Sequence, residues 1–118
     1  MKTLHLTLFR RWFIDILEGA KTEEYREIKP YWAKRLFQHY DTVTFRNGYA
    51  KDAPLMVMEF KGVETKTIYH PIHHKPMVVF AVKLGRILHT DNCDKLVSDK
   101  QLSIALDNIG ATSDAAQG

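Results

Sequence analysis

The sequence contains a single cysteine, Cys93, among its 118 residues. One cysteine cannot form an internal disulfide, and it is too few for a zinc site built on cysteines. A lone cysteine is also typical of a reducing compartment. The fold must therefore rest on a hydrophobic core rather than on cross-links, and the chain is long enough for one such core.

Long hydrophobic runs are absent as well. No stretch approaches the roughly 18 apolar residues that a membrane span requires. The initial Met-Lys-Thr is not followed by the apolar segment and small-residue cleavage site of a signal peptide. We therefore expect a cytoplasmic protein with no membrane partner.

Charge is distributed unevenly along the chain. Residues 1–90 carry 15 Lys and Arg against 9 Asp and Glu, whereas residues 91–118 carry 2 against 5. The first segment is therefore basic and the second acidic, and together they give the net charge of +3. A basic domain is compatible with a polyanionic partner such as RNA, although many proteins without that role have a similar excess. The acidic segment leaves a role in protein interaction or regulation open.

Hydrophobic periodicity predicts the secondary structure. Alternation from residue 3 to residue 9 predicts a strand with Leu4, Leu6 and Leu8 on one face. Further elements are predicted as a helix from residue 10 ended by Gly19, a strand over 22–28, a helix over 30–39, and strands over 42–46, 55–63 and 77–84, with a bulge at Gly85. This order favours an α+β fold, a small mixed β-barrel of about five to six strands with two helices, rather than a parallel sheet.

The C-terminal part differs from the barrel segment at 1–90. Ser98 and Gln101 match a capping box, and helical spacing follows as far as Gly110. A C-terminal helical extension is therefore predicted over residues 91–110. Residues 111–118 have no pattern and are predicted to be disordered.

The segment from Gly19 to Arg26 brings together three side chains of alternating charge. Lys21 follows a helix end, where the helix dipole stabilises a cation. Glu24 and Arg26 are two residues apart on a strand and project from the same face. One interpretation is a pocket in which the cations hold an anionic or carbonyl group and Glu24 accepts hydrogen bonds. The other is a surface ion-pair network worth about 0.2–1 kcal/mol per pair.

The pattern Gly19-x-Lys21-x-x-Glu24-x-Arg26, preceded by a Leu-x-Leu-x-Leu strand and an apolar helix, resembles the signature of the ASCH domain family. The turn at 45–49 and the strand at 79–85 are also similar to that family, so the resemblance covers residues 3–88. It implies a PUA-like β-barrel with a basic cleft beside the first helix, lined by the motif residues. It also implies that the protein binds RNA or a nucleotide.

The same resemblance implies an enzymatic alternative. Some relatives hydrolyse N4-acetylated cytidine with a lysine, a threonine and a glutamate. Lys21 matches the lysine, but Glu24 stands at the threonine position, and either Glu59 or Glu64 could replace the glutamate. The alternative is therefore a hydrolase acting on a modified nucleoside or on RNA, with Lys21 and Glu24 as the catalytic acid–base pair.

Further binding residues are expected from the aromatic and turn positions. Trp32 and Tyr49 could each stack on a base, Arg46 could contact phosphate, and Asn47 could read a base edge. The alternatives are purely structural roles, in which Trp32 closes one end of the barrel and Asn47 with Gly48 forms an ordinary hairpin turn.

Three histidines, His70, His73 and His74, lie in one proline-bounded loop. Histidine is a common zinc ligand, but neighbouring histidines in such a loop cannot easily point at one ion, and no carboxylate stands at ligand spacing. We therefore expect a surface loop, no metal site and no cofactor.

Overall fold

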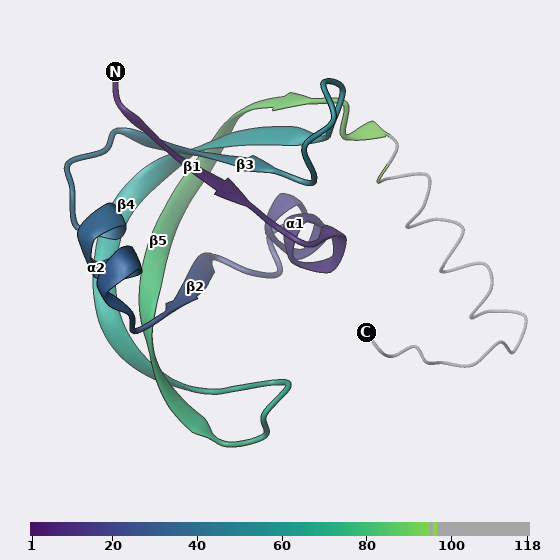
Figure 1. Cartoon of the computed structure of the whole chain (residues 1–118). Coiled ribbons are helices and arrows are strands. Elements are labelled where there is room, and N and C mark those ends of the chain that lie inside the picture. Colours follow the sequence, from purple (N-terminus) through teal and green to yellow (C-terminus); the bar gives the residue numbers. More distant parts are fainter. Residues whose placement is uncertain (95, 97–118) are drawn as a thin grey trace, which may run out of the picture.

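The structure is a computed structural model that describes residues 1–94 and 96. Within these residues the chain forms an α+β fold with five strands and two helices (Figure 1). In chain order the elements are β1 (Thr3–Thr7), α1 (Arg10–Leu17), β2 (Glu23–Glu27), α2 (Pro30–Leu36), β3 (Thr42–Arg46), β4 (Leu55–Tyr69) and β5 (Pro76–Asp91). The predicted helix within 91–110 and the predicted disorder of 111–118 lie outside the described residues, apart from 91–94 and 96. Over the described part of the chain, no helix combines the length and apolar character needed to cross a membrane.

The five strands form one mixed sheet in the order β1-β3-β4-β5-β2. β1 runs parallel to β3, and the other pairs are antiparallel. β1 and β2 are therefore the two edges, and no pairing between them is found among the described residues. The prediction of an α+β fold is confirmed, but the sheet is not closed into the predicted barrel. A side-chain bond occurs between the edges instead, from Arg26 Nη2 to the carbonyl oxygen of Thr7 at 3.3 Å.

The β4–β5 hairpin is the longest feature of the fold and curves through the whole molecule (Figure 1). Both strands extend well beyond the predicted 55–63 and 77–84. Register shifts interrupt the ladder between residues 57 and 63, and Gly62 has a φ of +105° there. One shift leaves Gly85 and Arg86 opposite Glu59, whose Oε1 accepts a hydrogen bond from the Arg86 N–H at 2.8 Å. This confirms the predicted bulge at Gly85, and bulges of this kind bend a strand pair.

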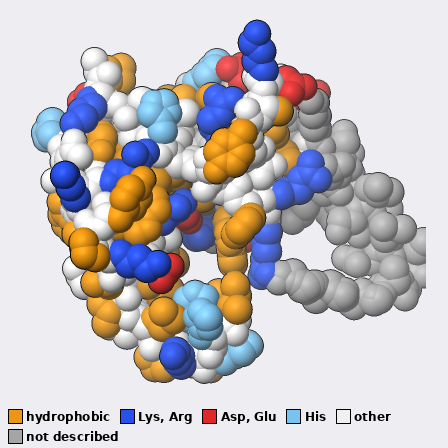
Figure 2. Space-filling view, in the orientation of Figure 1, with side chains coloured by type: hydrophobic (Ala, Val, Ile, Leu, Met, Phe, Trp, Pro, Cys, Tyr) orange, Lys and Arg blue, Asp and Glu red, His pale blue; other side chains and the backbone are white. Residues whose placement is uncertain are grey.

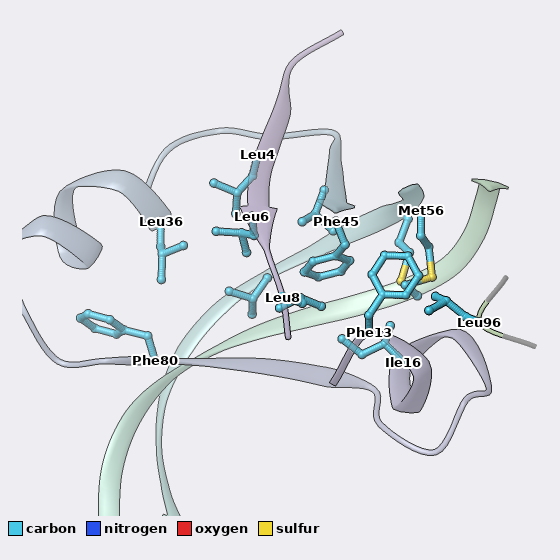
Figure 3. Packing of buried hydrophobic residues seen from close by; sticks show 13 residues of the cluster. Leu4, Leu6, Leu8, Phe13, Ile16, Leu36, Phe45, Met56, Phe80 and Leu96 are labelled. Carbon is cyan, nitrogen blue, oxygen red and sulfur yellow. The ribbon is translucent and has the colours of Figure 1, made fainter. Parts of the chain in front are cut away.

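The core lies between the sheet and the two helices α1 and α2 (Figure 3). Leu4, Leu6 and Leu8 point to the same side and are almost fully buried, as predicted from the alternation of β1. The core cluster consists of Leu4, Leu6, Leu8, Phe13, Ile16, Leu36, Val43, Phe45, Met56, Met58, Phe80, Val82 and Leu96. β5 lies between β4 and β2, so the apolar run at 79–82 belongs to a central strand, also as predicted.

α2 ends three residues earlier than predicted. The last helical residue is Leu36, and Phe37 leaves helical geometry with a ψ of 52°. The Phe37 ring then packs edge-on against Phe80 at 5.3 Å, and the Tyr40 hydroxyl donates to the Arg35 carbonyl oxygen at 2.6 Å. These contacts draw 37–40 out of the helix, although the apolar spacing continues to Tyr40.

Candidate functional site

The end of α1 sets the position of Lys21. Gly19 has a φ of +81°, a conformation that glycine adopts without a Cβ penalty. The Lys21 N–H donates to the Asp15 carbonyl oxygen at 3.1 Å, which holds the chain against the last turn of the helix. The Lys21 side chain extends over α1, where its Nζ lies 4.5 Å from the centre of the Trp12 ring.

Lys21, Glu24 and Arg26 form an ion triad. Glu24 Oε1 lies 3.0 Å from Lys21 Nζ, and Glu24 Oε2 lies 2.9 Å from Arg26 Nη2. Glu24 is only 5% exposed, and the side chains of both cations are 18% exposed. The three side chains therefore converge as their spacing predicts, but they form a largely buried cluster rather than a surface network.

Aromatic rings cover the cations of the triad. Lys21 Nζ lies 5.3 Å from the Tyr25 ring centre in addition to its contact with Trp12. The guanidinium carbon of Arg26 lies 4.8 Å from the centre of Trp32. Such cation–π contacts stabilise a cation that has lost part of its hydration. The triad and the three rings therefore form one preorganised unit.

Two adjoining hollows surround the triad. The hairpin chamber, about 470 Å³, lies between the α1–β2 segment and the tip of the β4–β5 hairpin. The turn chamber, about 720 Å³, extends past the start of α1 to the turn at 47–49. The two chambers share six lining residues: Trp12, Glu24, Tyr25, Arg26, Glu27 and His70. Together they form the cleft, around which Lys, Arg and hydrophobic side chains gather (Figure 2).

The charge of the cleft differs from the predicted basic surface. The ionised side chains that line it are Asp15, Lys21, Glu24, Arg26, Glu27 and Arg10. Acidic and basic groups are therefore present in equal number along this lining. The positive excess of residues 1–90 is located outside the walls of the cleft.

Of the three site residues predicted at the turn, two line the cleft and one does not. Asn47 and Tyr49 line the turn chamber, and Tyr49 is 89% exposed. The Asn47 amide donates to the Leu8 carbonyl oxygen at 2.9 Å, which ties the turn to the end of β1. Arg46 lines neither chamber, and its Nη2 donates to the Ala50 carbonyl oxygen at 3.1 Å. The site prediction for Arg46 is therefore not supported by its position.

Trp32 is both part of the cleft wall and part of the packing around the core. It lines the turn chamber, and it also packs against the hydrophobic core. The Arg26 guanidinium lies over its ring, and the Tyr31 ring meets it edge-on at 4.8 Å. Trp32 therefore holds Arg26 in place as well as forming a wall of the cleft.

The opposite side of β2 carries a second polar cluster. Glu23 Oε1 accepts hydrogen bonds from Lys66 Nζ at 2.6 Å and from the Tyr25 hydroxyl at 3.0 Å. The hydrogen bond from Lys66 is the main reason why the pKa of Glu23 lies below its ordinary value. Burial, followed by the bond to Glu23, raises the pKa of Tyr25. Tyr25 is thus anchored by its hydroxyl while its ring faces Lys21.

The two candidates for the glutamate of the amidohydrolases, Glu59 and Glu64, do not line the cleft. Glu59 pairs with Arg86 at 3.3 Å, next to the bulge. Glu64 pairs with Lys83 at 3.4 Å, and both side chains are about half exposed. A glutamate positioned for the chemistry of the resembled amidohydrolases is therefore not found at either place.

Sequence reasoning missed the contribution of His70, which lines both chambers. Trp12 and Tyr25 lie outside the periodic core faces and could be considered for base stacking from the sequence, but only Trp32 and Tyr49 are predicted from it as aromatic site residues. The His70 and His73 rings lie 4.4 Å apart. Within residues 1–94 and 96, no group of three or more His, Cys, Asp or Glu side chains is arranged to hold a metal ion.

No family model matches the sequence, and no solved structure matches it. A protein described as glycogen synthase, from Hydrogenobaculum sp. (strain Y04AAS1), is 32% identical to this chain over 90 residues. The matched segment covers 76% of this chain but 17% of that protein. The chain thus spans less than a fifth of its relative's length.

Proposed function

We propose that the protein binds RNA or a nucleotide in the cleft around the ion triad. The observation that carries this proposal is the pairing of Lys21 and Arg26 with the rings of Trp12, Tyr25 and Trp32 beside chambers of nucleotide size. Aromatic rings and guanidinium planes are the surfaces on which unstacked bases pack. The cations supply donors for phosphate or for base carbonyl groups.

The balanced charge of the cleft narrows this proposal. A groove that follows a long phosphate backbone needs an excess of cations, and the walls of the cleft have none. The cleft therefore suits one or two nucleotides with their bases inserted. The basic surface of residues 1–90 outside the cleft is available for the flanking phosphates of an RNA chain.

The proposed family is that of ASCH domains, with a PUA-like fold. Its support is the motif from Gly19 to Arg26, whose charged residues lie at the cleft, and the curvature of the sheet, which brings the edge strands β1 and β2 within reach of an Arg26 bond.

Binding is favoured over hydrolysis by the contacts of Glu24. Both of its oxygens are already paired with cations, so it is poorly placed to accept a proton from a substrate. The candidate glutamates Glu59 and Glu64 lie outside the cleft. Release of cytidine from N4-acetylcytidine, or cleavage of single-stranded RNA, would support the hydrolase instead, and chromatography after incubation would detect either.

The test is fluorescence anisotropy with labelled single-stranded RNA and with labelled mononucleotides over a range of salt concentrations. Lys21→Gln should weaken binding of either ligand about fivefold to tenfold, and for RNA it should lower the salt slope by about one. Lys61→Gln is the matched control, because Lys61 is exposed and lines neither chamber. Equal binding by wild type and Lys21→Gln, or no binding by the wild type, would refute the proposal.

A further inference from the structure

The tip of the β4–β5 hairpin is an ordered turn. The His70 N–H donates to the Lys75 carbonyl oxygen and the His74 N–H donates to the His70 carbonyl oxygen, both at 2.9 Å. The Tyr69 hydroxyl also donates to the His74 carbonyl oxygen at 2.9 Å. His74 takes a left-handed conformation, with a φ of 54°. These bonds fix the backbone of the tip, and histidine side chains are seen at this end of the molecule (Figure 2).

The contacts of His70 determine its tautomer. Its Nδ1 lies 3.1 Å from the backbone nitrogen of Ile72 and 3.2 Å from that of His73. A backbone N–H can only donate, so Nδ1 must accept and carries no proton. The neutral ring therefore carries its proton on Nε2. Nδ1 holds the turn, and no partner for Nε2–H is found among residues 1–94 and 96, which leaves it available as a donor.

His70 is also the polar group best placed on its side of the cleft. It lines both chambers, whereas its neighbours in the hairpin wall, Ile68, Ile72 and Met77, are apolar. The Tyr69 hydroxyl in the same wall already donates to a backbone oxygen. An apolar wall with one fixed donor suits a flat ring that has an acceptor at its edge, whereas a hydrated phosphate would lose its water there with little compensation.

We propose that His70 is a specificity-determining residue, whose Nε2–H donates a hydrogen bond to an acceptor at the edge of a base in the cleft. The inference rests on the proposed function and adds the residue that would distinguish one base from another. The acceptor is a ring nitrogen or a carbonyl oxygen of the base. The triad on β2 and His70 on the hairpin then contact the same ligand from two walls.

The test uses variants of His70 that distinguish the role of Nδ1 in the turn from the role of Nε2–H in the cleft. In His70→Asn, the amide oxygen can take the place of Nδ1 and preserve the turn, whereas the amide N–H₂ group lies near the former Cδ2 and does not reach the position of Nε2–H. His70→Ala removes both functions. His74→Asn is the matched control, because His74 lines neither chamber and asparagine tolerates its left-handed backbone. The affinity of each variant is measured for short single-stranded oligomers of uridine, cytidine or adenosine, and urea unfolding verifies that each variant is folded.

We expect the wild type to prefer one base and His70→Asn to reduce that preference about threefold to tenfold. His70→Ala should reduce the base preference at least as much as His70→Asn, because it also loses the bonds that hold the turn, and His74→Asn should keep the preference of the wild type. Equal affinity of the wild type for the three oligomers, or an unchanged preference in His70→Asn, would overturn the inference. A uniform loss of affinity with a lower salt slope would also overturn it, because such a loss indicates a phosphate contact.

The proposed function and this inference fail in different ways. If Lys21→Gln weakens binding while His70→Asn leaves base preference intact, the cleft binds RNA or a nucleotide but His70 does not read the base. If the wild type binds none of the oligomers and no mononucleotide, the proposed function itself is wrong.

Discussion

Replacement of Glu24 by glutamine tests whether the ion triad organises the cleft. The substitution preserves the shape of the side chain and one acceptor oxygen, but it removes the charge that faces Lys21 and Arg26. It also turns an amide N–H₂ group toward one of the two cations. Two largely buried cations then remain close together without their shared carboxylate.

The expected cost follows from burial. Removing one partner of a fully buried ion pair costs about 3–5 kcal/mol, and leaving a charged hydrogen bond unmade costs about 1.5–3 kcal/mol. Glu24 is 5% exposed, but the two cations keep 18% of their side-chain surface in water, and the glutamine retains one hydrogen bond. We therefore expect Glu24→Gln to lower the free energy of unfolding by about 2–3 kcal/mol.

The assay is urea denaturation of wild type and variant, followed by RNA anisotropy under conditions in which both are folded. Glu64→Gln is the matched control, because Glu64 pairs with Lys83 at the surface and should cost less than about 1 kcal/mol. RNA affinity should be retained or increased in Glu24→Gln, because the donors of Lys21 and Arg26 are released. A stability loss no larger than that of Glu64→Gln would refute the buried triad. A large loss of RNA affinity in the folded variant would show that Glu24 itself contacts the ligand.

Two further predictions concern the sheet. A Cβ at position 85 would lie 2.5 Å from Oε1 and 2.8 Å from Cβ of Glu59, so Gly85→Ala should reduce stability by about 1–3 kcal/mol in urea denaturation; an unchanged midpoint would contradict the tight bulge. The pKa of Glu23 is lowered chiefly by the hydrogen bond from Lys66. The ionised Glu23 therefore contributes to the free energy of unfolding above its unfolded-state pKa, and this contribution is lost as pH falls through the folded-state pKa. Glu23→Gln should therefore be less stable than wild type at neutral pH, and the difference should shrink as the pH falls below the unfolded-state pKa of about 4.3. A pH-independent difference would argue against this linkage.

Local patterns predicted the elements whose two faces differ in polarity. β1 alternates strictly, so Leu4, Leu6 and Leu8 could be assigned to the core. The outer half of the β4–β5 hairpin was not predicted, because its β4 segment at 64–67 is polar on both faces. This segment is nevertheless a strand, because it pairs with β5 through backbone hydrogen bonds. Backbone pairing does not depend on hydrophobic periodicity and therefore cannot be predicted from it.

The charged centre of the site was also accessible from the sequence. Lys21, Glu24 and Arg26 lie within six residues of each other, so a helix end followed by a strand suffices to bring them together. The sequence could not reveal how deeply they are buried. Their burial depends on Trp12 from α1 and Trp32 from α2, which cover them only once the helices pack on the sheet.

The sequence by itself therefore determined the α+β class, most of the elements and the ion triad, because each depends on residues that are close along the chain. The tertiary structure alone decided that the sheet stays open between β1 and β2, that Arg46 is not part of the cleft lining, and that His70 is. His70 lies 44 residues from Arg26 in sequence, and only the bulged, curved β4–β5 hairpin carries it to the cleft. The register and bending of paired strands are properties of two segments together, so neither segment encodes them alone.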